Sequence, residues 1–165
     1  MKSPQLDIYC MAIGGTGMAP LACLLQAQGH RVRGTDGPLY PPMSTLLEQA
    51  GIRPSQGYDP SHLDPRPDLV VIGNAIHRNN PEAVEAERLG LPILSMPQAL
   101  SRFFLEAHRP LVVSGTHGKT TTTAMAIWAL RALGWDPAYF LGGELPGIED
   151  GEGAANAGWG SGEWV

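Results

Sequence analysis

Gly118-Lys119-Thr120 is the segment whose residue types most directly indicate chemistry. It lies between an apolar run at 111–113 and a helical pattern, where backbone N–H groups can surround a phosphate. A lysine there reaches the β- and γ-phosphate oxygens, and the hydroxyl that follows it can coordinate Mg²⁺. The usual loop of this kind has a glycine where this sequence has Val113. We predict binding of ATP and Mg²⁺, with an inert, exposed lysine at a helix start as the alternative. The predicted ATP-binding residues are Gly115, Thr116, His117, Gly118, Lys119, Thr120 and Thr121, of which His117 could instead pack the loop.

A second glycine-rich segment, Gly14-Gly15-Thr16-Gly17, separates an earlier apolar run from another helical pattern that begins at Met18. Glycines allow the backbone to turn sharply and to approach a pyrophosphate, which N–H groups at a helix start can bind. Asp36 ends the next strand-like run, where a carboxylate could accept a hydrogen bond from a ribose hydroxyl. Pro20 stands where a dinucleotide-binding fingerprint has its third glycine. The pattern predicts a nucleotide site that includes Met18. A tight turn without a ligand, with Asp36 as a capping residue, is the alternative.

A polar segment, 74–80, follows the apolar run 69–72. Parallel α/β sheets bind ligands beyond the carboxyl ends of their strands. Asn74, Ala75 and His77 are therefore candidates for contacts to a uracil or a sugar phosphate, and an ordinary polar loop is the alternative.

Other residues that could bind ligands are assigned to packing or to the surface. Cys10 and Cys23 form no CxxC motif and fall within a strand-like and a helical run, so we expect two small buried side chains. Trp128 falls on the apolar face of its helical pattern and is expected in the core. The remaining histidines have no metal-binding spacing and are expected at the surface or at helix ends: His30, His62 and His108.

Short strand-like runs alternate with helical periodicity, which predicts an α/β fold with a mainly parallel, Rossmann-like sheet. The expected strands are 6–13, 31–35, a short one from 52, 69–72, 92–94, 111–113 and 138–141. The expected helices begin at 18, at 44 with Ser44 as the cap, at 81, at 98 and at 120. A boundary near 107–110 predicts one domain over 1–107 and the beginning of a P-loop ATPase domain over 108–165. Residues 142–162 are rich in glycine and are expected to be mobile.

Composition narrows the function classes. The 165 residues carry a net charge of −5, with 43% hydrophobic and 16% charged residues, which favours a packed core over intrinsic disorder. The acidic balance disfavours a nucleic-acid partner. The sequence has neither a signal peptide nor a run of roughly 20 apolar residues, so we expect a soluble, cytoplasmic protein without a membrane partner. Nothing indicates the oligomeric state.

The segment 115–121, preceded by the first glycine loop, resembles the Mur ligase family, the ATP-dependent amide-forming enzymes of peptidoglycan synthesis. The resemblance covers essentially the whole chain. It is greatest to the branch that recycles murein peptides, through Tyr40–Leu47, Gln56–Pro60 and Ile72–Ala75. The sister branch, which adds L-alanine, is the alternative.

The resemblance implies a Rossmann-like domain for UDP-N-acetylmuramate, a central ATPase and a C-terminal domain for the incoming amino acid or peptide. It implies that the N-acetylmuramate carboxylate attacks the γ-phosphate of ATP to form an acyl phosphate. The amine of the murein tripeptide L-Ala-γ-D-Glu-meso-diaminopimelate then displaces phosphate. Lys119 would be catalytic, because it would neutralise charge on the transferring phosphoryl group, and Thr120 would hold Mg²⁺.

The family's metal-binding acidic residue, its carbamylated lysine and its adenine- and amine-binding residues all correspond to positions beyond 165. We therefore expect an N-terminal fragment that binds the UDP-sugar but has no ligase activity alone. A non-catalytic nucleotide-sugar binding module is one alternative. A nicotinamide-dependent dehydrogenase is another, suggested by Gly15, Gly17 and Asp36, but it leaves Lys119 unexplained.

Overall fold

The structure is a computed structural model that describes residues 4–106, 108–142 and 156–165. The chain divides into two compact units, Met1–Leu100 and Ser101–Val165. This division precedes the expected boundary at 107–108, because Phe104 packs against Trp159 within the second unit, with ring centroids 4.9 Å apart. Among the described residues, no helix combines the length and apolar character needed to cross a membrane.

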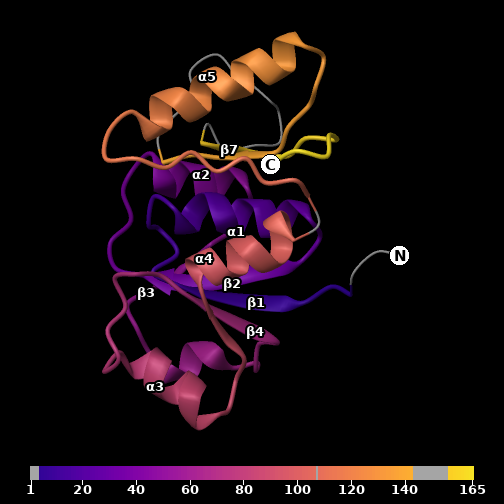
Figure 1. The fold of residues 1–165 in the computed structure, drawn as a ribbon. Coiled ribbons are helices and arrows are strands. Elements are labelled where there is room, and N and C mark those ends of the chain that lie inside the picture. The colour runs from indigo at the N-terminus through magenta and orange to yellow at the C-terminus, as the bar shows by residue number, and fades with distance from the viewer. Residues whose placement is uncertain (1–3, 107, 143–155) are drawn as a thin grey trace. The chain divides into compact units, whose positions relative to one another are not determined.

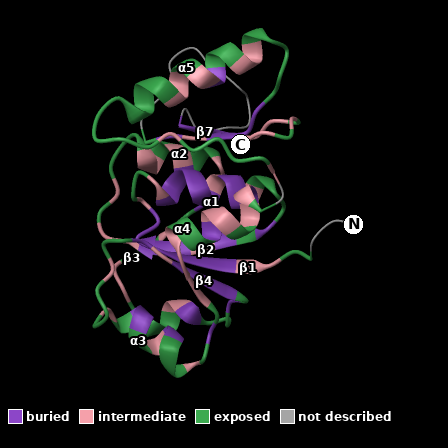
Figure 2. Ribbon diagram, in the orientation of Figure 1, coloured by how far each residue is buried: buried purple, intermediate pink, exposed green. Residues whose placement is uncertain are grey.

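The first unit contains a five-stranded sheet in the order β3-β2-β1-β4-β5, with every pairing parallel (Figure 1). The strands are β1 (Asp7–Met11), β2 (Arg31–Asp36), β3 (Ser55–Gln56), β4 (Leu69–Ile72) and β5 (Ile93–Ser95). Because β1 and β4 are buried on both faces, their sequences are nearly continuous apolar runs (Figure 2). The predicted parallel α/β fold is confirmed.

Helices cover both faces of this sheet (Figure 1). They are α1 (Met18–Ala27), α2 (Met43–Gln49), the 3₁₀ helix η1 (Pro60–Leu63), α3 (Pro81–Arg88) and α4 (Met96–Leu100). The α1 helix contacts α2 and α4, whereas α3 and η1 pack together on the opposite face. There Ala83, Ala86 and Leu63 form one apolar cluster with Tyr9 and Val70.

Several local predictions for this unit are wrong. The α2 helix begins at Met43 after Pro42, and its first turn is closed without Ser44 as a cap. The short strand expected from Ile52 lies at β3 instead, and Ile52 is a buried core residue. Of the two positions expected for His30, the surface is wrong, because this residue is only 8% exposed. It follows the end of α1, where its N–H donates to Leu25 O at 3.2 Å. Cys10 is buried as expected, and Cys23 is half-buried.

The second unit contains the π-helix η2 (Ser101–Leu105), α5 (Lys119–Ala132) and the antiparallel strands β6 (Tyr139–Phe140) and β7 (Ala157–Gly158). The helix expected from residue 98 to 105 is thus divided between α4 and η2. The run 111–113 forms no regular strand. Leu111 N donates to Val165 O at 2.7 Å, and the neighbouring Arg109 forms an isolated bridge with Trp164. Residues 143–155, within the segment expected to be mobile, lie outside the described residues.

The helical phase of α5 differs from the prediction. Ile127 packs against Tyr139 and Leu141, so this side of α5 faces the core of the unit. Trp128 lies one position further round the helix and is 48% exposed. The expected core position of Trp128 is therefore wrong.

Candidate nucleotide-binding sites

The first glycine-rich segment connects the carboxyl end of β1 to the start of α1. Ala12 has φ 57°, a left-handed conformation that residues with a Cβ seldom adopt, and Gly15 N donates to its carbonyl at 3.2 Å. No side chain caps α1 at Gly17, and Met18 is buried at the first helical position. Gly15 and Thr16 are exposed. The turn therefore presents the start of α1 beyond the carboxyl edge of the sheet, where the helix dipole favours an anion.

Asp36 is bound to this turn. Its Oδ2 accepts a hydrogen bond from Gly14 N at 2.7 Å, and its Oδ1 accepts one from Gly37 N at 2.7 Å. The Tyr58 hydroxyl lies 3.5 Å from Oδ1, and burial, followed by the charge of Asp36, raises the pKa of Tyr58. A carboxylate oxygen can accept two hydrogen bonds. Asp36 can therefore hold the turn and still accept a bond from a ribose hydroxyl.

The segment after β4 reaches the same edge. Gly73 N donates to Met11 O at 3.0 Å, which joins the end of β4 to the end of β1. Beyond it, Asn74, Ala75 and His77 are exposed. The strand order reverses at β1, because β2 lies on one side of it and β4 on the other. Open α/β sheets bind ligands at such a switch point.

A cavity of about 320 Å³ lies at the carboxyl ends of β2 and β3. The residues that line it were not predicted from the sequence: Gly37, Pro38, Leu39, Pro54, Ser55 and Gln56. Only two of them are in a strand, and the rest are in loops without a recognisable motif. Pairing of β2 with β3 brings the two loops together, and short-range sequence patterns do not indicate such a pairing.

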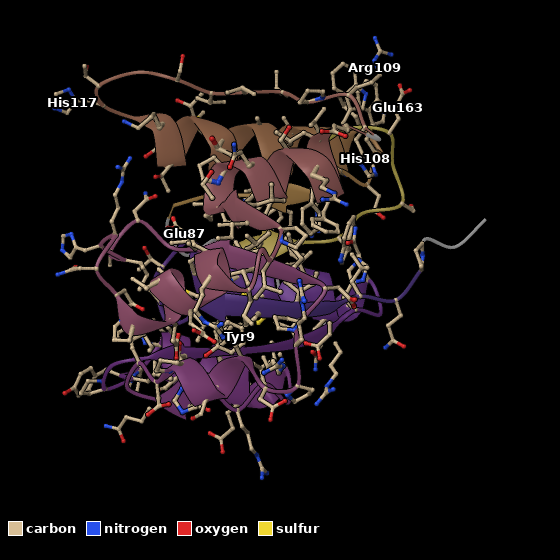
Figure 3. All side chains as sticks on the ribbon, turned by 90° about the horizontal axis from the view of Figure 1, so that it is seen from below. Tyr9, Glu87, His108, Arg109, His117 and Glu163 are labelled. Carbon is tan, nitrogen blue, oxygen red and sulfur yellow. The ribbon has the colours of Figure 1, made fainter. Side chains whose placement is uncertain are left out.

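A buried carboxylate near the carboxyl edge of the sheet was also not predicted from the sequence. Glu82, in the first turn of α3, is 0% exposed and accepts hydrogen bonds from Tyr9, Thr35 and the backbone N of Asp59. His62 Nδ1 lies 2.9 Å from Glu82 Oε1. Burial raises the pKa of Tyr9, which keeps its hydroxyl protonated as a donor. Figure 3 labels Tyr9 in the interior of the unit. In the sequence, Glu82 is an ordinary acidic residue after a helix-starting Asn80-Pro81, and such residues are usually solvated.

The predicted ATP loop is in the second unit, directly before α5. Gly118 precedes the helix with φ 75°, a conformation that glycine adopts without strain. Lys119 Nζ donates to the carbonyls of Gly115 at 2.6 Å and Thr116 at 3.2 Å, so the loop curls around the ammonium group. His117 is exposed at the tip of the loop (Figure 3).

The hydroxyls that could reach a metal are exposed at the start of α5, at Thr120 and Thr121. Within the described ranges, no group of three or more His, Cys, Asp or Glu side chains could hold a metal ion. A single threonine hydroxyl fits Mg²⁺ bound chiefly through phosphates and water, which is the usual arrangement for this ion. Thr120 therefore fits the predicted role only together with a nucleotide.

The sequence model described as "Mur ligase family, catalytic domain" matches residues 7–108. The chain belongs to the Mur ligase family. The predicted resemblance is thereby confirmed, and the match spans the whole parallel sheet of the first unit.

Two curated relatives carry the names of the two ligases considered from the sequence. The chain is 49% identical over 142 residues to the UDP-N-acetylmuramate–L-alanyl-γ-D-glutamyl-meso-2,6-diaminoheptandioate ligase of Escherichia coli, covering 86% of this chain and 31% of the relative. It is 41% identical over 146 residues to the UDP-N-acetylmuramate–L-alanine ligase of Kineococcus radiotolerans, covering 87% and 31%. This member of the Mur ligase family thus spans about a third of the length of these relatives.

A solved structure agrees with this placement. The murein peptide ligase of Psychrobacter arcticus superposes with a TM-score of 0.87 at 42% identity, covering 95% of this chain and 34% of that one. The Mur ligase family fold therefore extends over both units.

Proposed function

We propose that the chain provides the UDP-N-acetylmuramate site and the triphosphate-binding loop of an ATP-dependent ligase. This ligase joins L-Ala-γ-D-Glu-meso-diaminopimelate to UDP-N-acetylmuramate in the recycling of peptidoglycan. The observation that carries the proposal is the meeting of three segments at one sheet edge: the 14–17 turn, Asp36 and the segment from Asn74 to His77.

Each part of the UDP-sugar fits a different feature of this edge. The pyrophosphate fits the start of α1, where backbone N–H groups and the helix dipole favour an anion. The ribose fits Asp36, and the 320 Å³ cavity beside Asp36 is large enough for a base. The exposed amide of Asn74 and the ring of His77 supply polar groups for the sugar.

The second unit would bind the triphosphate. Lys119 would exchange its hydrogen bonds to the Gly115 and Thr116 carbonyls for bonds to phosphate oxygens, and Thr120 would help to hold Mg²⁺. Bound Mg²⁺ would neutralise negative charge on the phosphates. Lys119 would then favour attack by the substrate carboxylate, because its charge compensates the charge that develops on the transferring group.

Ligation is proposed for a protein that includes the remainder of the family's length, since this chain spans 31% of its curated relatives. We expect the 165 residues alone to bind the UDP-sugar without forming the amide. A UDP-N-acetylmuramate–L-alanine ligase is the second candidate, supported by the 41% identity to the Kineococcus radiotolerans protein of that name. Both candidates share the same nucleotide-sugar site, so the first experiment tests that site.

The experiment is a calorimetric titration of the chain with UDP-N-acetylmuramate, with NADH as the comparison ligand. We expect saturable binding of the UDP-sugar and none of NADH. Gly17→Leu should abolish binding, because even a Cβ at this position would lie 2.8 Å from Met96 Cε and a larger side chain would fill the turn. Glu87→Leu, which introduces the same residue on the exposed side of α3, should bind normally. No binding by a folded wild-type chain, or unchanged binding by Gly17→Leu, would contradict the proposal.

A further inference from the structure

The carboxylate of Glu82 joins four elements of the first unit. Oε1 accepts hydrogen bonds from the Tyr9 hydroxyl on β1 at 3.0 Å and from the Asp59 backbone N before η1 at 3.1 Å. His62 Nδ1 in η1 lies 2.9 Å from the same oxygen. Oε2 accepts a hydrogen bond from the Thr35 hydroxyl on β2 at 2.7 Å. A buried carboxylate is unfavourable unless such donors compensate for lost hydration, so these bonds are required for Glu82 to be buried.

One route leads from Glu82 to the proposed sugar segment. The Asn80 side chain accepts hydrogen bonds from Glu82 N at 2.9 Å and Ala83 N at 3.3 Å, and Asn80 N donates to His77 O at 2.9 Å. The other end of this segment is held where Gly73 N donates to Met11 O. The position of His77 therefore depends on where Glu82 holds the first turn of α3.

A second route leads to the pyrophosphate turn. Thr35 immediately precedes Asp36, whose Oδ2 accepts the hydrogen bond from Gly14 N. Asp59 immediately follows Tyr58, whose hydroxyl lies 3.5 Å from Asp36 Oδ1. Glu82 thus holds the residues next to both side chains of the Asp36–Tyr58 pair.

We propose that Glu82 is a positioning residue of the UDP-sugar site, which fixes the 14–17 turn and the 74–80 segment relative to each other. The assignment of that site rests on the function proposed above. Glu82 itself touches no substrate. Its four partners are directional, so it sets the geometry of both segments as well as the stability of the unit.

The test compares Glu82→Leu with Glu82→Gln. Glutamine has the same shape: its oxygen can accept from Tyr9, Asp59 N and His62, and its NH₂ group can donate to the Thr35 hydroxyl. Leucine leaves these buried groups without their acceptor. At a temperature where circular dichroism shows both variants folded, we expect Glu82→Leu to bind UDP-N-acetylmuramate about tenfold or more weakly, and Glu82→Gln to stay within about threefold of wild type.

Amide NMR signals of the ligand-free chain separate positioning from stability. In Glu82→Leu the signals of Gly14 and His77 should both move, and Glu82→Gln should restore them. Leu25→Val, a change in the fully buried part of α1, is the matched control that should lower stability and leave both signals and the affinity unchanged. If Glu82→Leu does not fold, Thr35→Val removes one partner of Oε2 and should move the Gly14 signal alone.

The outcomes distinguish this proposal from the function on which it rests. Absence of UDP-sugar binding by the folded wild-type chain contradicts the proposed function, whereas the ligand-free signals still decide the role of Glu82. The positioning role is overturned if the Gly14 and His77 signals do not move in a folded Glu82→Leu variant. It is also overturned if the Gly14 signal does not move in Thr35→Val. Wild-type affinity in Glu82→Leu overturns it equally, because a displaced site would bind more weakly.

Discussion

Replacement of Asp36 by asparagine should loosen the turn between β1 and α1. In the structure both carboxylate oxygens accept backbone hydrogen bonds at 2.7 Å, Oδ2 from Gly14 N and Oδ1 from Gly37 N. Asparagine offers one oxygen and one NH₂ group in place of two oxygens. Asp36→Asn therefore keeps one of these bonds and places a donor against the other N–H group.

The magnitude follows from the kind of bond that is lost. A hydrogen bond to a charged group contributes about 1.5–3 kcal/mol to stability. Asp36 is partly exposed, and water can reach the unpaired N–H group, so we expect a loss near the lower end, about 1.5–2 kcal/mol in the free energy of unfolding. For a unit of this size, that loss corresponds to a fall in Tm of about 6–16 °C.

The assay can separate the two units because the tryptophans are unevenly distributed. All of them lie in the second unit, at 128, 135, 159 and 164, whereas the first unit contains tyrosines. Urea unfolding followed by far-ultraviolet circular dichroism, to which the helices of the first unit contribute, should show the loss. Tryptophan fluorescence should report an unchanged transition of the second unit.

Asp68→Asn provides the matched control. The Asp68 carboxylate accepts a hydrogen bond from Asp7 N at 2.8 Å at the opposite end of β1, but this pair is exposed and the asparagine oxygen can replace the acceptor. We expect a much smaller loss from this change. Equal losses in Asp36→Asn and Asp68→Asn would refute the reasoning, because they would show that the two-amide geometry at Asp36 contributes nothing specific.

Three further predictions concern the sheet, the ATP loop and pH. Gly34→Ala places a Cβ 2.9 Å from the backbone carbonyl carbon of Cys10 in β1 and should lower the free energy of unfolding of the first unit by about 1–3 kcal/mol in urea. Gly37→Ala is the control and should leave this free energy unchanged, because no heavy atom lies within 4 Å of the added Cβ. Equal losses in the two variants would contradict the packing argument. Lys119→Ala should weaken ATP binding in calorimetry by about tenfold or more without changing the Tm, whereas unchanged affinity would leave the ATP site without support. Burial lowers the pKa of His30, whose Nδ1 accepts a hydrogen bond from Leu6 N. As the pH falls below about 6.5, the His30 imidazole therefore takes up a proton more readily in the unfolded chain than in the folded one, which favours unfolding. The Tm difference between wild type and His30→Gln should therefore narrow or reverse between pH 7.5 and 5.5. A Tm difference that stays constant over this range would contradict the lowered pKa of His30.

The elements and the two glycine-rich turns were predictable because their signals are local. An apolar run such as Leu69–Ile72 can be recognised from its own residues, and a glycine such as Gly118 marks the turn that follows or precedes a helix. The carboxyl edge of the sheet follows from the parallel topology alone. Thus the placement of the 14–17 turn and of the 74–77 segment at one edge needed no long-range contact to be inferred.

The contacts between distant residues were not predictable in this way. Glu82 and Tyr9 are 73 positions apart, and nothing in either neighbourhood indicates that a carboxylate and a phenol meet in the core. The ring of the buried His30 accepts a hydrogen bond from the backbone N–H of Leu6, and this contact depends on the connection between α1 and β2. For Trp128, the error was about one residue of helical phase, because α5 has apolar residues on more than one side.

Asp36 shows why a sequence fingerprint and a structural contact can describe one residue in two ways. An acidic residue at the end of the second strand is typical of a ribose contact, yet here the same carboxylate holds the amide of Gly14 in the turn before α1. The two roles are compatible, because a ligand that binds the turn benefits if the turn is already ordered. A ribose hydroxyl on Asp36 would then bind to a group whose position Thr35 and Glu82 have fixed. The affinity of the edge for a nucleotide should accordingly depend on buried residues that the nucleotide never touches.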